Sequence, residues 1–277
     1  MISYRRLSVC LLIHVVSAPS YADSVLELQT MEFGQGQPVV GTVQISSAGK
    51  DARLEIISVT SGEAGGLIFH GEQNEMIILD HAQGTYMIID QARMNAMASQ
   101  VSDAMSQMQE ALAAMPPEQR ALAEQMMQQR FPTAPPEQPS ETINDLGSHG
   151  EVAGIACRNY EVIRDGLKVR ELCVSDWDDI HGGQETANAL KGVANFFEGM
   201  RKAFSGAGGM DVFDRQQELF GHMDELDGYP VLYRDFSASG ALERQTILTG
   251  AREEERSPDF FQPPAGYSFQ ELPQGAN

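Results

Sequence analysis

Residues 24–90 alternate between short strand-like segments and turn-rich breaks, and this pattern constrains the fold more than any other part of the sequence. The breaks read GQGQP, SAGKD, SGEAGG, HGEQN and HAQG. Glycine, proline, asparagine and aspartate end strands and form tight turns. The pattern predicts an antiparallel β-meander with strands at 24–32, 39–47, 52–59, 66–70, 75–80 and 85–90.

The last two of these strands differ from the others. Their sequences, MIILD and YMIID, are apolar at nearly every position. A strand with one face in water instead alternates apolar and polar residues. We therefore expect these two strands to lie between two apolar layers.

A helical segment rich in methionine follows immediately. Its apolar residues recur every three or four positions, which places them on one face of a helix. This methionine stripe consists of Met94, Met97, Val101, Met105, Met108, Leu112 and Met115. Pro116 and Pro117 interrupt the pattern, so we predict two helices, 92–115 and 117–130. Because thioether side chains adapt to irregular surfaces, this pair is either core packing or an adaptable cover over an apolar cavity.

Residues 1–22 have the layout of a secretory signal peptide. Two arginines precede a short apolar run at 7–16, and a small–x–small cleavage pattern ends at Ala22. The run is too short to span a bilayer. Cys10 precedes most of the run, whereas the modified cysteine of a lipid-anchored lipoprotein follows it. We expect a soluble periplasmic protein that begins near Asp23.

The mature chain, 23–277, is strongly acidic. It has 255 residues, a length suited to the single domain that we predict. Without the two arginines of the signal peptide it holds 17 basic and 39 acidic residues, a net charge of −22. This charge argues against nucleic acid as a partner. The sequence after the signal peptide has no apolar run long enough for a transmembrane helix.

The mature chain keeps two cysteines, Cys157 and Cys173, and an even pair in an exported protein predicts a disulfide. They flank a hairpin centred on an Asp-Gly pair. A two-residue loop there places Cys157 opposite Val174, whereas a three-residue loop, 164–166, places it opposite Cys173. We therefore predict the disulfide and the longer loop together. No C-x-x-C motif points to redox catalysis.

The second half of the chain separates its strands from its helices. Residues 131–149 are rich in proline and polar residues and are predicted to be a surface linker. The part from 150 to 272 then contains the cysteine hairpin, helices at 184–205 and 211–226, a hairpin formed by YPVLYRDF and ALERQTILT, and an extended end. Segregated rather than alternating elements indicate an α+β fold.

The order of these elements resembles the lipoprotein carriers LolA and LolB. Phe261, Pro264, Gly266 and Tyr267 match the F-x-x-P-x-G-Y end of that superfamily, and GKDARLEI resembles its G-K-x-x-R strand. GIACRNYEV and LDHAQGTYMIID are similar to an exported family of unknown function in Gram-negative bacteria. The resemblance implies a curved antiparallel sheet, an unclosed β-barrel, covered by a helical pair. A strand arginine of the carriers helps to hold their lid closed, which implies such a role for Arg53.

Patterns that would indicate catalysis or metal binding are weak. Asp176, Asp178, Asp179 and His181 offer metal ligands but lack the glycine and distal glutamate of an EF-hand loop, so we predict a solvated acidic turn. Neither H-E-x-x-H nor G-x-S-x-G occurs. We predict no catalytic residue, no metal and no cofactor, and hence no enzyme.

Two functions from different classes remain. In the first, the inner side of the sheet and the helices enclose a cavity for an acyl chain or another lipid-like ligand. In the second, the methionine stripe fills the core or docks another protein of the cell envelope, and no small molecule binds. The residues expected to line the cavity are Met76, Ile78, Met87, Ile89, Met97, Val101, Met105 and Met108, together with Arg53.

Overall fold

The computed structural model describes residues 23–34, 36–58, 64–116, 119–120, 141–203, 226 and 228–271. The strands in this part of the chain are β1 (Asp23–Glu32), β2 (Val39–Ala48), β3 (Asp51–Ser58), β4 (Ala64–His70), β5 (Glu75–Asp80), β6 (Thr85–Ile89), β7 (Glu141–Val152), β8 (Ile155–Arg164), β9 (Leu167–Ser175), β10 (Tyr229–Phe236), β11 (Leu242–Glu254) and β12 (Ser268–Phe269). The helices are α1 (Gln91–Ala114) and α3 (Gly183–Ala203), with the 3-10 turns η1 (Trp177–Asp179) and η2 (Pro258–Phe261).

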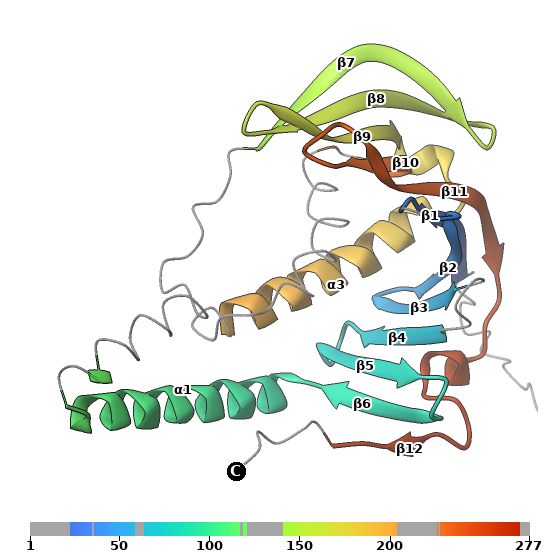
Figure 1. Ribbon diagram of the computed structural model, residues 1–277. Helices are drawn as coiled ribbons and strands as arrows, with labels where there is room; N and C mark the ends of the chain where they lie inside the picture. Colours follow the sequence, from blue (N-terminus) through green and yellow to red (C-terminus); the bar gives the residue numbers. More distant parts are fainter. Residues whose placement is uncertain are drawn as a thin grey trace, which may run out of the picture.

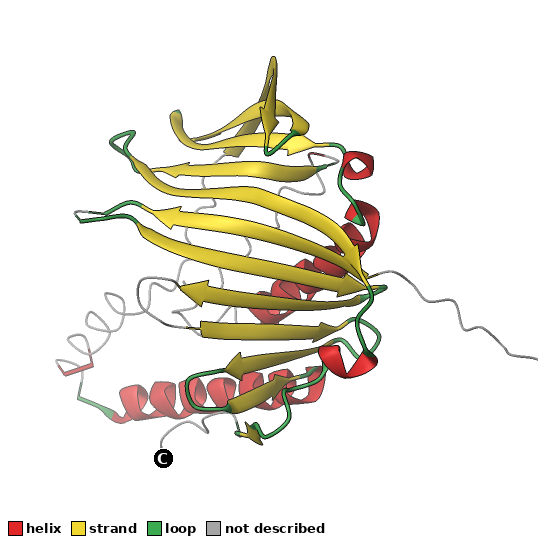
Figure 2. Cartoon of the chain, turned by 90° about the vertical axis from the view of Figure 1, so that its right-hand side faces the viewer, coloured by secondary structure: helices red, strands yellow, loops and turns green. Residues whose placement is uncertain are grey.

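All of these strands belong to one sheet, in the order β12-β6-β5-β4-β3-β2-β1-β11-β10-β9-β8-β7. Its neighbouring strands are antiparallel except for β12, which pairs with β6 in parallel. The sheet bends around α3, and its end strands β12 and β7 lie on opposite sides of the opening (Figure 1). Figure 2 views the outer face, with α3 behind it. The predicted α+β fold with an unclosed, curved sheet is confirmed; the parallel β12 makes the sheet mixed.

The six strands predicted for residues 24–90 are all present, with ends that differ by at most two residues. Their turns hold the residues that turns require. Asn74 and Gly84 adopt left-handed backbone angles, with φ of 49° and 63°, which asparagine and glycine tolerate best. Local turn chemistry therefore specifies this half of the sheet.

Helix α3 fills the inner side of the sheet. Leu190, Val193 and Phe196 are buried in the main core, and the ring centroid of Phe196 lies 5.9 Å from that of Phe69 on β4. Helix and strand approach closely at Gly192, where an added Cβ would lie 2.7 Å from the Phe69 ring. Full burial of each such side chain contributes about 1.5–3 kcal/mol, so α3 is a main support of the fold.

A chain of buried hydroxyl groups fixes the start of α3 to the sheet. The hydroxyl of Thr186 lies 2.9 Å from that of Ser24 on β1 and 3.0 Å from that of Ser47 on β2. Ser24 in turn donates to the carbonyl of His181. Because buried hydroxyl groups are costly without partners, these bonds favour one position for the helix.

Helix α1 confirms the helix predicted for 92–115. Asp90 caps it, because its carboxylate accepts a hydrogen bond from the Arg93 backbone N–H at 2.7 Å. Asp90 is also the one residue that separates β6 from α1. The helix therefore starts at the β6 side of the sheet and extends away from it (Figure 1).

This position differs from the one expected for residues 92–130, which were predicted to cover the inner side of the sheet. The helix at the centre of the inner side is α3, and α1 joins the core through its first turns, where Met94 is buried and Met97 is partly buried. The short connection at Asp90 explains the difference. One residue between β6 and α1 is too few to carry the helix back across the sheet. The helix predicted for 117–130 lies outside the described residues except for Gln119 and Arg120, which are helical.

Strands β5 and β6 lie between two apolar layers, as predicted. On β5, Met76 faces the main core, whereas Ile77 and Leu79 face an outer cluster. Phe261 of η2 is buried in that outer cluster. The C-terminal segment therefore supplies the second layer, and this accounts for strands that are apolar on both faces.

The prediction of a linker at 131–149 is wrong for its last part, residues 141–149. Residues 141–149 belong to β7, which pairs with β8, while 131–140 lie outside the described residues. Most of β7 is exposed, and its register shifts between Asp145 and His149. A polar, bulged edge strand has little hydrophobic alternation, so its sequence resembles a loop. The helix predicted at 211–226 also lies outside the described residues, apart from Leu226.

Candidate functional site

Strands β5 and β6 bring four of the predicted site residues to one face of the sheet. Met76 is paired with Ile89, and Ile78 with Met87, so all four side chains point to the inner side. Met76 and Ile89 are buried, whereas Ile78 and Met87 are partly exposed. The four residues that the sequence analysis named on these two strands therefore share one face of the sheet.

The methionine stripe of α1 continues from this face. Met94 is 2 % exposed, and Met97 is partly buried and packs against the main core. Farther along, Met108 and Leu112 are partly exposed, and Met115 at the end of the helix is 38 % exposed. The stripe therefore leaves the core while it remains apolar. Val101 and Met105 lie on α1, but their side chains are outside the described part of the structure.

The rest of the inner side is occupied by α3. Its residues Phe197 and Met200 are buried in the same core as Met76 and Met94, and α3 contacts β1, β2, β3 and α1. The inner side thus has two parts. One is a closed core beneath α3, and the other is the partly exposed apolar surface of β5, β6 and α1.

Arg53 lies on the opposite face of the sheet from these residues. Its neighbour Leu54 packs against the inner core, so the alternation of β3 points Arg53 outward. The Arg53 guanidinium donates to the carbonyl of Phe260 at 2.6 Å and lies over the Phe260 ring. The placement of Arg53 among the cavity residues was wrong, because it fastens the C-terminal segment to the outer face.

A chain of polar contacts extends this fastening. Glu55 accepts a hydrogen bond from Arg53 at 2.6 Å and lies 2.6 Å from the His81 ring. The other nitrogen of His81 lies 2.7 Å from the Tyr267 hydroxyl. The G-K-x-x-R and F-x-x-P-x-G-Y segments, far apart in the sequence, therefore meet in space through Arg53 and Tyr267.

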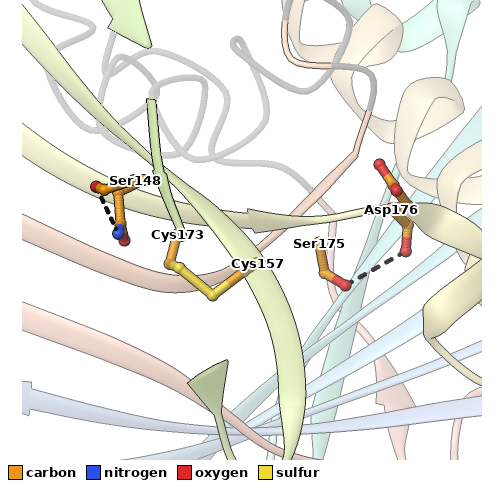
Figure 3. Close-up of a disulfide and its surroundings, with 6 residues drawn as sticks. Ser148, Cys157, Cys173, Ser175 and Asp176 are labelled. Carbon is orange, nitrogen blue, oxygen red and sulfur yellow. Dashed lines mark hydrogen bonds between the residues drawn. A yellow bond between two sulfur atoms is a disulfide. The ribbon is translucent and has the colours of Figure 1, made fainter. Parts of the chain in front are cut away.

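The disulfide between Cys157 and Cys173 is present, and it joins β8 to β9 within the inner core (Figure 3). The prediction of a three-residue loop at 164–166 is wrong. Asp165 and Gly166 form a two-residue turn with φ of 52° and 80°, which suits the tight turns of hairpins. A register shift then places Asn159 opposite Cys173, yet the Cα atoms of the two cysteines are 5.3 Å apart and within bonding range.

Two clefts also occur among the described residues. One, of about 430 Å³, contains Asp235 between Arg170 and Arg244, which donate to its two carboxylate oxygens at 3.0 and 2.6 Å. Burial lowers the pKa of Arg244, but Asp235 outweighs this effect and holds the pKa above its usual value. The other cleft, of about 660 Å³, lies where β1 begins. Neither cleft contains a residue predicted for the cavity.

The acidic turn near η1 contains no assembled metal site. Among the residues that the structure describes, no three His, Cys, Asp or Glu side chains are grouped to hold a metal ion. Asp176 instead lies 3.6 Å from the Arg158 guanidinium. Within the same part of the chain, no helix has the length and apolarity needed to cross a membrane.

Proteins similar to this chain are found among solved structures, while no family model and no curated protein matches it. One is an uncharacterized conserved protein from Thermus thermophilus, with 6 % identity, a TM-score of 0.43 and coverage of 91 % of each chain. A second is the MucA/MucB complex of Pseudomonas aeruginosa, with 10 % identity, a TM-score of 0.35 and coverage of 89 % of this chain and 57 % of the matched one. A third is a DUF1329 family protein from Desulfovibrio piger, with 10 % identity, a TM-score of 0.29 and coverage of 88 % and 91 %.

Proposed function

We propose that this protein is exported to the periplasm and binds a hydrophobic, lipid-like molecule on the inner side of its sheet. The binding surface is the methionine stripe together with the inner faces of β5 and β6. The observation that carries the proposal is the passage of this stripe from the core at Met94 to partial exposure at Met108. An apolar surface that continues from a core into solvent is suited to an apolar ligand.

The chemistry of the surface favours an acyl chain over a rigid or polar ligand. Met87, Met97 and Met108 present flexible, polarisable side chains, and such chains adapt to ligands that lack a fixed shape. Methionine, isoleucine and leucine have no group that titrates or attacks a substrate. We therefore assign binding to this surface, and no catalysis.

A second candidate is a docking surface for another protein of the cell envelope. It is favoured by α3, which already fills the inner side next to β1–β4, and by the 38 % exposure of Met115 at the far end of the stripe. An amphipathic helix with an exposed apolar stripe is a common means of protein recognition.

The decisive experiment is mass spectrometry of extracted lipids. The protein is first purified from the periplasm of the organism that naturally produces it. We expect a lipid in the wild type and its loss in Met97→Lys and Met108→Lys, because a buried ammonium group is strongly disfavoured against an acyl chain. Ser99→Lys and Gln107→Lys are matched controls, since both residues are exposed on the other side of α1. No lipid in the wild type, with a co-purifying envelope protein that Met108→Lys releases, would favour the second candidate.

A further inference from the structure

The methionines on the inner side of the sheet and along α1 and α3 fall into two groups by exposure. The first group, the buried methionines, belongs to the main core and consists of Met76, Met94 and Met200, with exposed fractions of 1 %, 2 % and 3 %. The second group, the accessible methionines, is partly or fully exposed and consists of Met87, Met97, Met108 and Met115. A reagent in solvent can therefore reach the second group but not the first.

These thioethers are the sulfur atoms that an oxidant can attack. Residues 23–277 contain two cysteines, Cys157 and Cys173, and both are held in the disulfide. A disulfide has no thiolate that could consume the oxidant first. Exposed thioethers react with peroxides, whereas buried ones react only when their region of the protein opens. An oxidant would therefore act first on the exposed part of the methionine stripe.

An apolar stripe does not require methionine at the exposed positions of α1. Leucine has a similar volume and an equally good helix propensity, and Leu112 is a member of the same stripe with partial exposure. Met108 and Met115 do not belong to the main core among the described residues. The property that methionine adds here, besides flexibility, is a sulfur atom that can be oxidised reversibly.

We propose that the accessible methionines form an oxidation site that switches off the binding surface. In each reaction hydrogen peroxide transfers one oxygen atom to a thioether sulfur. The S–O bond forms as the O–O bond breaks, the sulfur is oxidised to the sulfoxide, and the peroxide is reduced to water. A methionine sulfoxide reductase reverses the step, because a dithiol supplies the electrons and protons that remove the oxygen as water. The inference rests on the proposed function, since the surface is the one assigned to a lipid-like ligand.

The added oxygen changes the surface where the ligand would lie. A sulfoxide is a polar acceptor, and an acyl chain packed against it would remove its water without offering a hydrogen bond. Burial of a polar group without a partner opposes binding. Met94 stays a thioether and keeps the start of α1 in the core. Oxidation should therefore release the ligand without unfolding the protein.

The first test is a map of oxidation along the chain. The purified protein, with its disulfide intact and its bound lipid removed, is treated with dilute hydrogen peroxide. Peptide mass spectrometry then gives the sulfoxide fraction of each methionine over time. We expect Met108 and Met115 to react at least about tenfold faster than Met94, because the reagent reaches a buried side chain only when the core opens. Equal rates in the buried and accessible groups overturn the inference.

The second test measures the affinity for a dansyl-labelled fatty acid before and after this oxidation. In the wild type we expect oxidation to weaken binding about tenfold or more, because several sulfoxides would lose water against the chain. The comparison variant removes the accessible thioethers by Met87→Leu, Met97→Leu, Met108→Leu and Met115→Leu. Its affinity before oxidation should stay within about threefold of the wild type, because the volumes are similar. Oxidation should then weaken its binding by less than about threefold, since these sulfurs are gone.

Met31→Leu is the matched control. Met31 is also partly exposed, but Leu28 on the same strand packs in the main core, so the alternation of β1 points Met31 to the outer face. This variant should lose affinity on oxidation as the wild type does.

Three results would overturn the inference alone: an unchanged affinity of the oxidised wild type, an equal loss in the variant with four leucines, or a loss that comes with global unfolding in urea. An unoxidised wild type that carries no lipid and does not bind the fatty acid overturns the proposed function, and the switch with it.

Discussion

Helices α1 and α3 have similar lengths, 24 and 21 residues, but they occupy different environments. The apolar face of α3 is buried along most of its described length, from Ala187 to Met200. In α1 only Met94 is buried among the side chains that the structure describes. Both sequences show apolar residues at helical spacing. The spacing therefore predicts which face is apolar, but not whether that face is covered.

The connections of the two helices explain the difference. The chain passes through η1 and the turn at 180–182 before α3 begins, and this segment carries it over the inner side of the sheet. A single residue joins β6 to α1. Connection length and direction, which depend on the whole sheet, decide which helix can pack across it.

The largest expected effect concerns the core beneath α3. Phe196→Ala should lower the free energy of unfolding by about 3–5 kcal/mol, because it leaves a cavity next to Phe69. Denaturant unfolding with the disulfide intact measures this change. A loss below about 1 kcal/mol would show that α3 is not the main support of the sheet.

Removing the disulfide tests how much the crosslink stabilises the β8–β9 end of the same core. Replacing both Cys157 and Cys173 by Ala should cost about 3 kcal/mol, as expected for a crosslink between residues 16 positions apart. Thermal unfolding of the double variant, compared with the oxidised wild type, measures the loss. If reduction leaves the wild type unchanged, then the inner core holds the hairpin without help from the crosslink.

The outer layer is tested by Arg53→Ala. This change removes the guanidinium that holds the Phe260 carbonyl and the Glu55 carboxylate, and it should cost about 2 kcal/mol because both contacts are largely shielded from water. Arg252→Ala is the matched control. Arg252 also pairs with a glutamate two residues away, Glu254, but in an exposed setting, so its loss should cost less than about 1 kcal/mol. Similar losses in unfolding free energy would contradict a fastening role for Arg53.

The smallest expected effect lies within α1 itself. Met108→Ala should change the unfolding free energy by less than about 1 kcal/mol, whereas Met94→Ala should cost about 2 kcal/mol, since Met94 is buried and Met108 is partly exposed. Urea unfolding of both variants gives the comparison. A cost at Met108 as large as that at Met94 would mean that the stripe is covered in solution.

The candidate binding surface could be predicted in part. Met76, Ile78, Met87 and Ile89, which the sequence analysis named, share one face of β5 and β6, because side-chain direction in a strand follows from position alone. Arg53 was misplaced. Its face is set by the register of β3, which puts Leu54 inward, and by a partner segment that closes over it from residue 260 onward.

The sequence by itself determined the local features of this protein: the six strands of the meander, the helix at 92–115 and the pairing of Cys157 with Cys173. Each depends on residues close together along the chain, where turn chemistry and periodicity act directly. Only the tertiary structure decided which helix lies across the sheet and how Arg53 meets Phe260. Those outcomes join residues as many as 207 positions apart, and contacts over such separations depend on how the whole sheet curves, which no local pattern encodes.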